Sequence, residues 1–150
     1  MEKNHYRPLV IMVTLSYISM YLLMYAMVNS IDNVYPNFNQ FYMAGLMTAP
    51  MLLIELFVMR GMYQNKQLNR AIIGGCVIVL AACFMLIRQQ TAISDRQFLR
   101  SMIPHHAGAI LMCQRASLRD EEIKKLCDSI ISGQQAEIDQ MRAKLRELDK

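Results

Sequence analysis

Three long apolar stretches before residue 88 constrain the fold of this chain more than any other feature. They cover residues 9–28, 41–59 and 71–87, and Glu55 is the only charged residue inside them. About 20 helical residues cross the hydrocarbon core of a bilayer, and each stretch comes close to that length. A soluble bundle would have to bury three nearly uncharged helices. We therefore expect residues 1–88 to form a domain of three transmembrane helices.

The positions of the basic residues predict how these helices are oriented. Five Lys or Arg residues lie before the first stretch or between the second and the third: Lys3, Arg7, Arg60, Lys66 and Arg70. The connection formed by residues 29–40 has neither Lys nor Arg. Because positive charge is enriched on the cytoplasmic side, we expect the N-terminus to lie inside and everything after Arg88 to lie outside. In a bacterium, this protein would be a multi-pass inner-membrane protein with its C-terminal domain in the periplasm.

The remaining part of the chain is polar. Residues 89–150 carry ten Lys or Arg and nine Asp or Glu, with the two signs interleaved. The formal net charge of +4 for the whole chain is therefore not gathered into a basic patch. Nucleic acid binding is not expected.

A helical hairpin is predicted for residues 94–150. Ser94 and Gln97 have the spacing of a capping box, and Pro104 is expected to kink the first helix. One face of this helix is predicted from spacings of four and three: Phe98, Met102, His105, Ala109, Met112 and Ala116. After a break at residues 116–120, a second helix carries Ile123, Cys127, Ile130, Gln134, Glu137, Met141, Leu145 and Leu148 on one side. No strand is predicted, so the fold class is all-α.

Two helices bury too little apolar surface to be very stable alone. We therefore expect the hairpin to pack against the membrane domain or against a second copy of itself. A homodimer of hairpins would form a four-helix bundle.

Residues 102–113 hold the densest group of side chains that could bind a metal. Met102, His105 and Met112 share one face of the helix, whereas His106 aligns with Cys113. Thioether, imidazole and thiol are the ligands that favour Cu(I). The alternative is that the methionines fill gaps in a core and that the histidine pair is structural.

The sequence around this group also resembles a known family. The matching segments are Asp95-Arg96-Gln97-Phe98, Met102-Ile103-Pro104-His105-His106, Gly108-Ala109-Ile110, Met112, Gln134 or Gln135, Glu137-Ile138 and Met141. They are similar to the signature of the domain of unknown function 305 family, over roughly residues 94–145. The resemblance implies a ferritin-like helical bundle, here half of one, and a periplasmic copper-binding role linked to copper tolerance. It also implies His105, His106, Met102 and Met112 as metal ligands, with Met141 and Glu137 contributed by the second helix.

The four cysteines divide into two pairs. Cys113 and Cys127 lie on opposite arms of the hairpin, where they could form a disulfide in an oxidising compartment, join the metal ligands as thiols, or serve only as small apolar residues. Cys76 and Cys83 lie in the third apolar stretch, where packing is the ordinary role of a cysteine.

The second stretch holds a row of methionines with an acidic residue. Met43, Met47, Met51, Glu55 and Met59 recur every four residues. Three spans with such a row resemble eukaryotic-type copper uptake channels, although the predicted orientation is reversed. An acidic residue inside a span suggests function, but Glu55 lies near the cytoplasmic end, where it could reach water or Arg60.

The leading hypothesis is a membrane-anchored protein that sequesters Cu(I) or hands it to a copper-handling partner. No nucleophile with a base and an orienting group is evident, so we do not expect an enzyme. The alternatives are a membrane interaction module with a structural histidine pair and a channel lined by methionines.

Overall fold

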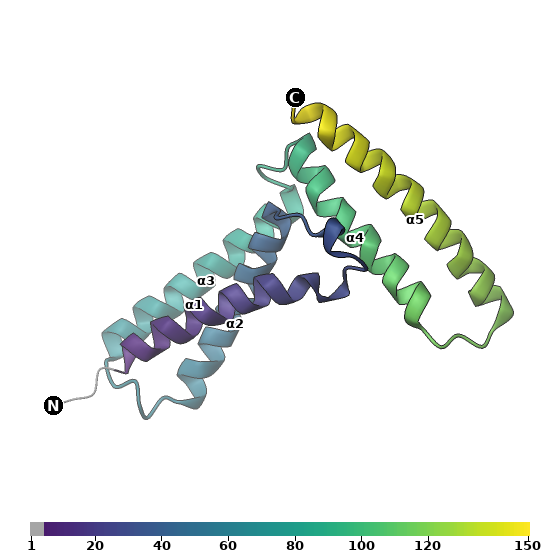
Figure 1. Cartoon of the computed structure of the whole chain (residues 1–150). Coiled ribbons are helices and arrows are strands. Elements are labelled where there is room, and N and C mark those ends of the chain that lie inside the picture. The colour runs from purple at the N-terminus through teal and green to yellow at the C-terminus, as the bar shows by residue number, and fades with distance from the viewer. Residues whose placement is uncertain (1–4) are drawn as a thin grey trace. The chain divides into compact units, whose positions relative to one another are not determined.

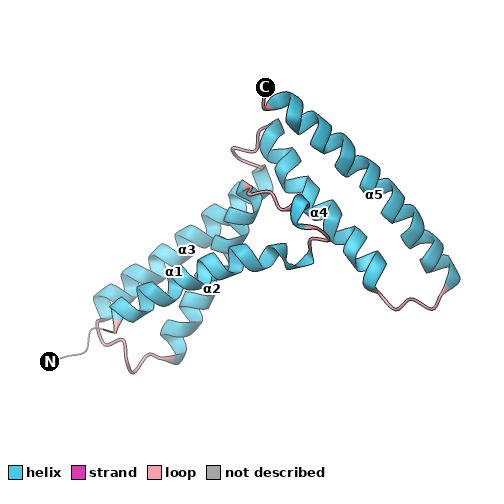
Figure 2. Ribbon diagram, in the orientation of Figure 1, coloured by secondary structure: helices cyan, strands magenta, loops and turns pink. Residues whose placement is uncertain are grey.

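The computed structural model describes residues 5–150 (Figure 1). Within this range all regular structure is helical and no strand occurs, as the sequence predicts (Figure 2). The α-helices are α1 (Tyr6–Leu23), α2 (Phe38–Val58), α3 (Lys66–Gln89), α4 (Asp95–Arg115) and α5 (Glu121–Leu148). Two short 3-10 helices, η1 (Met24–Met27) and η2 (Ile31–Asn33), follow α1.

Three helical segments are long and apolar enough to cross a membrane, namely Tyr6–Met27, Phe38–Val58 and Lys66–Gln89. Each segment begins a few residues before the apolar stretch that predicted it, because its first turn is polar. Asn65 caps α3, for example, with its side-chain oxygen accepting a hydrogen bond from the Leu68 amide at 2.9 Å. The first segment also differs from a single α-helix, since its last turn is the 3-10 helix η1.

The chain divides into two compact units. The first, which we call the apolar unit, contains the described residues up to Leu23 together with Asn39–Thr91. The second, which we call the polar unit, contains Met24–Phe38 and Ala92–Lys150. The connection between α1 and α2 therefore belongs to the same unit as α4 and α5, whereas hydropathy places the domain boundary near residue 88.

The apolar unit has a small core near the start of α1. Leu9, Leu56 and Tyr63 form a buried cluster, and the Tyr6 hydroxyl donates a hydrogen bond of 2.9 Å to Asn69 Oδ1 of α3. Elsewhere most of its large side chains are on the outside, such as Ile78, which is 69% exposed. This is the distribution that lipid-facing helices require.

In the polar unit α4 and α5 pack against each other in opposite directions (Figure 1). A disulfide joins Cys113 to Cys127 near one end of the pair, and an ion pair of 3.1 Å joins Arg96 to Asp149 at the other. The core between the helices consists of Ile103, Ala107, Ile110, Ile138 and Leu145. Val28 and Tyr35 of the α1–α2 connection pack against this core and add a further layer.

The predicted faces of α4 and α5 can be compared with the residues that the structure buries. The face of α4 predicted from Phe98, Met102, His105 and Met112 is a continuous stripe, but it is not the buried face. The buried stripe lies beside it and contains Ile103, Ala107 and Ile110. On α5 most of the predicted side is covered: Leu145 is buried, and Cys127, Ile130, Gln134, Met141 and Leu148 are half-buried. Ile123 and Glu137 of that side are exposed, and the neighbouring Ile138 is fully buried.

The N-terminus of α4 also differs from the predicted capping box. Ser94 is the N-cap residue, but its side chain makes no capping hydrogen bond. The side chain of Gln97 is used elsewhere, because its Oε1 accepts a hydrogen bond of 3.1 Å from the Phe38 amide. Pro104 lies inside α4, which remains helical from Asp95 to Arg115. The first turn of α4 is thus fixed by the α1–α2 connection rather than by its own cap.

Candidate metal site

The centre of the candidate site is a contact between α4 and α5. His106 Nδ1 lies 3.0 Å from Glu137 Oε2. The His106 side chain is only 13% exposed, whereas Glu137 is 54% exposed. Although the two atoms are close, they are not aligned as a hydrogen bond, and Nδ1 has no other hydrogen-bond partner. A buried ring nitrogen that is left unsatisfied in this way retains its full capacity to bind a ligand.

The surroundings of His106 keep its imidazole neutral. Burial lowers the pKa of His106 below its ordinary value, and His105 acts in the same direction, whereas the Glu137 carboxylate opposes them. Neutral imidazole is the form that coordinates metal ions. The lowered pKa of His106 therefore favours the neutral form that can bind a metal ion.

Two methionines lie beside this pair, one from each helix. Met102 precedes His106 by one turn of α4, and Met141 follows Glu137 by one turn of α5. Because the helices run in opposite directions, Met102 and Met141 both lie toward the same end of the helix pair from the His106–Glu137 contact. Both residues are half-buried, and Met141 packs against the core. The structure thus brings His106 and Glu137 into contact, and Met102 and Met141 are each one helical turn away along the two helices.

His105 and Met112 lie on a different part of α4. His105 is exposed, and its ring centroid is 6.0 Å from that of His106. Met112 is 53% exposed. Adjacent residues of a helix point about 100° apart, so His105 and His106 do not face the same point. These two predicted ligands are therefore not part of the arrangement at His106.

Within residues 5–150, no three His, Cys, Asp or Glu side chains come together in a way that could hold a metal ion. A site at His106 and Glu137 would therefore need the thioethers of Met102 and Met141 to complete its ligands. Imidazole with thioether is a combination that suits copper better than zinc.

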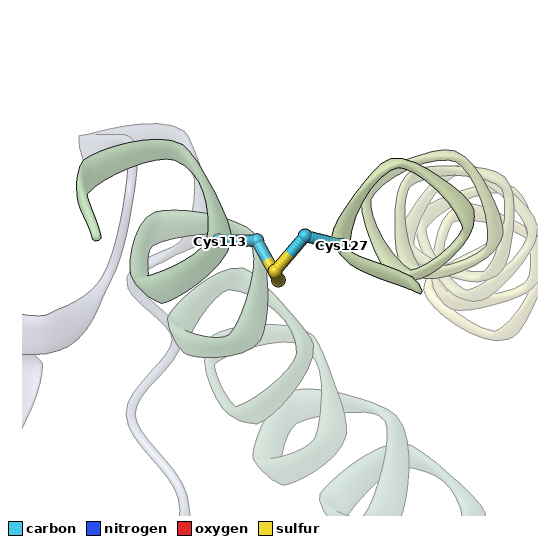
Figure 3. The surroundings of a disulfide bond; sticks show 2 residues. All are labelled: Cys113 and Cys127. Carbon is cyan, nitrogen blue, oxygen red and sulfur yellow. A yellow bond between two sulfur atoms is a disulfide. The ribbon is translucent and has the colours of Figure 1, made fainter. Parts of the chain in front are cut away.

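The two cysteines of the polar unit form a disulfide (Figure 3). The Cα atoms of Cys113 and Cys127 are 5.2 Å apart. This is the first of the three roles considered for the pair, and in this state neither sulfur is a thiolate ligand. Cys76 and Cys83 of α3 are free.

The acidic residue of α2 has a partner that the sequence did not suggest. The Tyr63 hydroxyl donates a hydrogen bond of 3.2 Å to Glu55 Oε1, so a neighbouring tyrosine rather than Arg60 contacts this carboxylate. Burial raises the pKa of Tyr63, and the Glu55 charge adds to this effect. No periodicity relates the two residues, because Tyr63 lies in the connection beyond the end of α2.

The methionine row of α2 lies mainly on the surface of the apolar unit. Met43, Met47 and Met59 are exposed. A cavity of about 480 Å³ lies among the three helices, and it is lined by residues such as Thr14, Tyr17, Thr48 and Cys76, with no methionine among them. A channel lined by these methionines would therefore require several copies of the chain.

Comparison with known proteins shows to which family the chain is similar. The family model described as "Domain of unknown function (DUF305)" matches residues 58–145. The match thus extends across α3, beyond the segment 94–145 in which the signature was noticed. An uncharacterized protein of Acanthamoeba polyphaga mimivirus is 34% identical over 142 residues, which cover 93% of this chain and 91% of that protein. No solved structure matches the chain.

Proposed function

The chain belongs to the family described as Domain of unknown function (DUF305), and from this premise we propose that it is a membrane-anchored copper-binding protein. Its role would be to sequester Cu(I) or to hand it to a copper-handling partner, not to catalyse a reaction. The polar unit would lie in an oxidising, non-cytosolic compartment such as a bacterial periplasm. There α4 and α5 would form half of a ferritin-like bundle and carry the metal site.

The observation that carries this proposal is the position of His106 beside Glu137. Two ligand atoms that each lie about 2.1 Å from one tetrahedral ion are about 3.4 Å apart. The distance of 3.0 Å between Nδ1 and Oε2 is slightly shorter, so binding would move the two atoms apart by about 0.4 Å. One ion could therefore bind both atoms with little movement of either helix, and Met102 and Met141 would supply the thioethers.

The exposure of the site favours transfer over permanent storage. Glu137 is more than half exposed, so one side of the site is open to water. A partner could approach the ion from that side and replace the carboxylate first. A fully buried ion would have to wait for the helices to separate.

The two chain segments that form the polar unit support a chain that crosses the membrane three times. Three crossings place the α1–α2 connection and the segment after α3 on the same side. These two segments are the ones that make up the polar unit. The disulfide supports the non-cytosolic side of the membrane as the location of the polar unit, because disulfides persist in oxidising compartments and not in the cytosol.

A competition titration tests the site. The full-length chain in lipid nanodiscs is titrated with Cu(I) against a chromogenic chelator, with ascorbate as reductant because thiols would also reduce the disulfide. His106→Ala is expected to weaken binding by about 10–100-fold. His5→Ala, which removes the one histidine outside the polar unit, is the control and is expected to bind as the wild type does.

Equal affinity in His106→Ala and the wild type would contradict the site. No binding by either protein would favour the interaction module instead. A fusion of alkaline phosphatase after Lys150 in a bacterial host tests the side of the membrane. An active fusion is expected, whereas an inactive one would place the polar unit in the cytoplasm.

A further inference from the structure

Two arginines of the polar unit are half-buried without a partner for their charge. They are Arg100 of α4 and Arg142 of α5, and the Nε atom of each is buried and has no hydrogen-bond partner. Neither side chain takes part in an ion pair within residues 5–150. A buried donor that carries charge is costly to leave unsatisfied, so an anion that reaches these guanidinium groups would stabilise the polar unit.

The neighbouring residues on the two helices do not neutralise these charges. No Asp or Glu lies three or four residues from Arg100, which are the positions that a helix brings close together. Asp139 lies three residues before Arg142, but its Oδ1 accepts a hydrogen bond of 3.0 Å from Gln135. The anion that these arginines require is therefore not supplied by their own helices.

Both arginines belong to one segment of the helix pair. This segment is bounded at one end by the ion pair that Arg96 forms with α5, and at the other by the contact that His106 forms with α5. Arg100 lies between these two residues on α4, and Arg142 lies between their two partners on α5.

The two arginines also lie on the same edge of this segment. From the pitch of a helix, Arg100 is about 120° from His106 around α4, with the buried Ile103 midway between them. Arg142 is about 140° from Glu137 around α5, again across the buried stripe of the helix. Because His106 and Glu137 meet at one edge of the contact between the helices, the two arginines lie at the other edge.

Two hydrogen bonds connect this part of α4 with the beginning of a helix that is apolar enough to cross a membrane. The amide of Phe38, the first residue of that helix, donates a hydrogen bond of 3.1 Å to Gln97 Oε1. Asn37 Nδ2 donates a hydrogen bond of 3.5 Å to the backbone carbonyl of Arg100. Arg100 is thus within one helical turn, about 5 Å, of a residue that contacts the start of the span. The headgroup layer on each side of the hydrocarbon core is about 5–7 Å thick, so Arg100 is within reach of phospholipid headgroups.

We propose that Arg100 and Arg142 together bind the phosphate group of a phospholipid headgroup. A guanidinium group is planar and presents two parallel N–H donors, which match two oxygens of one phosphate. One phosphate between the two arginines neutralises both charges and ties this end of the helix pair to the bilayer. The inference rests on the membrane-spanning part of the proposed function and does not depend on copper.

Native mass spectrometry of the full-length chain, released from detergent micelles that contain phosphatidylglycerol, tests this proposal. The wild type is expected to retain one lipid per chain. Arg100→Gln and Arg142→Gln are each expected to lower the amount of retained lipid about tenfold, because each removes hydrogen bonds to a charged group. Arg119→Gln is the matched control, because Arg119 is exposed in the turn between α4 and α5. This control is expected to retain as much lipid as the wild type.

Two further measurements separate the headgroup site from general attraction of charge and from misfolding. Arg100→Lys keeps the charge but loses the planar pair of donors, and it is expected to retain less lipid than the wild type and more than Arg100→Gln. The mass of each variant also shows whether the disulfide between Cys113 and Cys127 has formed, and hence whether α4 and α5 have paired.

Inorganic phosphate, added in place of the lipid, distinguishes a headgroup from a free ion. It is expected to bind far more weakly, because it has no acyl chains in the bilayer or micelle to hold it near the arginines. A wild type that binds inorganic phosphate as readily as phosphatidylglycerol would overturn the headgroup as the ligand.

Equal retention of lipid by the wild type, Arg100→Gln and Arg142→Gln would overturn the proposal, and so would a wild type that retains no lipid. Failure of the membrane anchoring proposed above has a different result. In that case the wild type would not float with phosphatidylglycerol vesicles in a density gradient. If only the headgroup site is wrong, the wild type and both variants float alike and retain lipid alike.

Discussion

The apolar unit and the polar unit are built from the same element, the α-helix, but they distribute their large apolar side chains in opposite ways. In the polar unit Ile103, Ile110 and Ile138 are fully buried, and the outside carries charge. In the apolar unit Ile78 and Phe57 lie on the outside, and a cavity remains among the helices. Because both units are helical, helix propensity does not distinguish them. The difference lies in the surroundings that each surface requires. In the proposed function the polar unit is surrounded by water and the apolar unit by lipid.

The largest expected difference in the free energy of unfolding comes from replacing one isoleucine in each unit by alanine. Ile138→Ala removes a fully buried side chain and is expected to lower the free energy of unfolding of the polar unit by about 4 kcal/mol. Ile78→Ala removes a side chain that is on the outside and is expected to have almost no effect. Pulse proteolysis in urea, with the chain in nanodiscs, measures both. A similar loss for Ile78→Ala would mean that another protein surface covers this face.

The two cysteine pairs give the next largest contrast. Replacing Cys113 and Cys127 together by Ala opens a loop closed by a sequence separation of 14 and is expected to cost about 3 kcal/mol. Replacing Cys76 and Cys83 by Ala removes two free thiols and is expected to cost far less. Mass spectrometry after alkylation should find only the second pair modified in the unreduced chain. Alkylation of all four cysteines would show that the disulfide does not form.

A smaller difference is expected at the helix caps. Asp120 accepts hydrogen bonds from the Glu122 and Ile123 amides, so Asp120→Ala should cost the polar unit about 1 kcal/mol. Asn65→Ala removes the corresponding cap of α3. Its expected effect is confined to faster hydrogen exchange in the first turn, since the rest of a helix in lipid cannot release its backbone groups. Exchange that spreads along α3 would contradict the lipid environment.

The smallest expected effect is a pH dependence limited to the polar unit. The folded-state pKa of His106 is lowered, so the unfolded chain takes up a proton first as the pH falls below about 6.5. Stability without metal is therefore full above this pH and declines as the pH falls toward the folded-state pKa. Glu137→Gln should lower the pKa of His106 further, because the carboxylate favours the protonated form. An NMR titration of the imidazole checks both shifts, and a higher pKa in Glu137→Gln would contradict the contact.

The sequence predicted the three apolar helices well, because length and hydropathy alone identify them. It predicted which residues of α4 share a face but not which face of α4 is buried, for a physical reason. Two stripes run along this helix, one through Phe98 and Met112 and the other through Ile103 and Ile110. The same spacing generates both, and only contact with α5 decides which one is buried.

The candidate site shows the same limit. The histidine pair was proposed from the density of ligand side chains in residues 102–113, whereas Glu137 was proposed only from the family resemblance. Which atoms meet depends on the register of α5 against α4, and the turn at residues 116–120 and the disulfide set that register. The Glu55 contact with Tyr63 could not be foreseen, because it crosses the end of a helix.

The polar unit is formed by two segments that lie far apart in the sequence, and this has a consequence for biosynthesis. Residues 24–38 leave the ribosome long before α4 does, and the hydrogen bond between Phe38 and Gln97 spans 59 positions of the chain. Val28 and Tyr35 therefore have no core to cover until the third apolar helix is in place. A chain that stalls or inserts incorrectly would leave these side chains uncovered, which is the kind of surface that chaperones and proteases recognise. If the chain crosses the membrane as proposed, completion of the polar unit would thus report that all three preceding helices have been inserted.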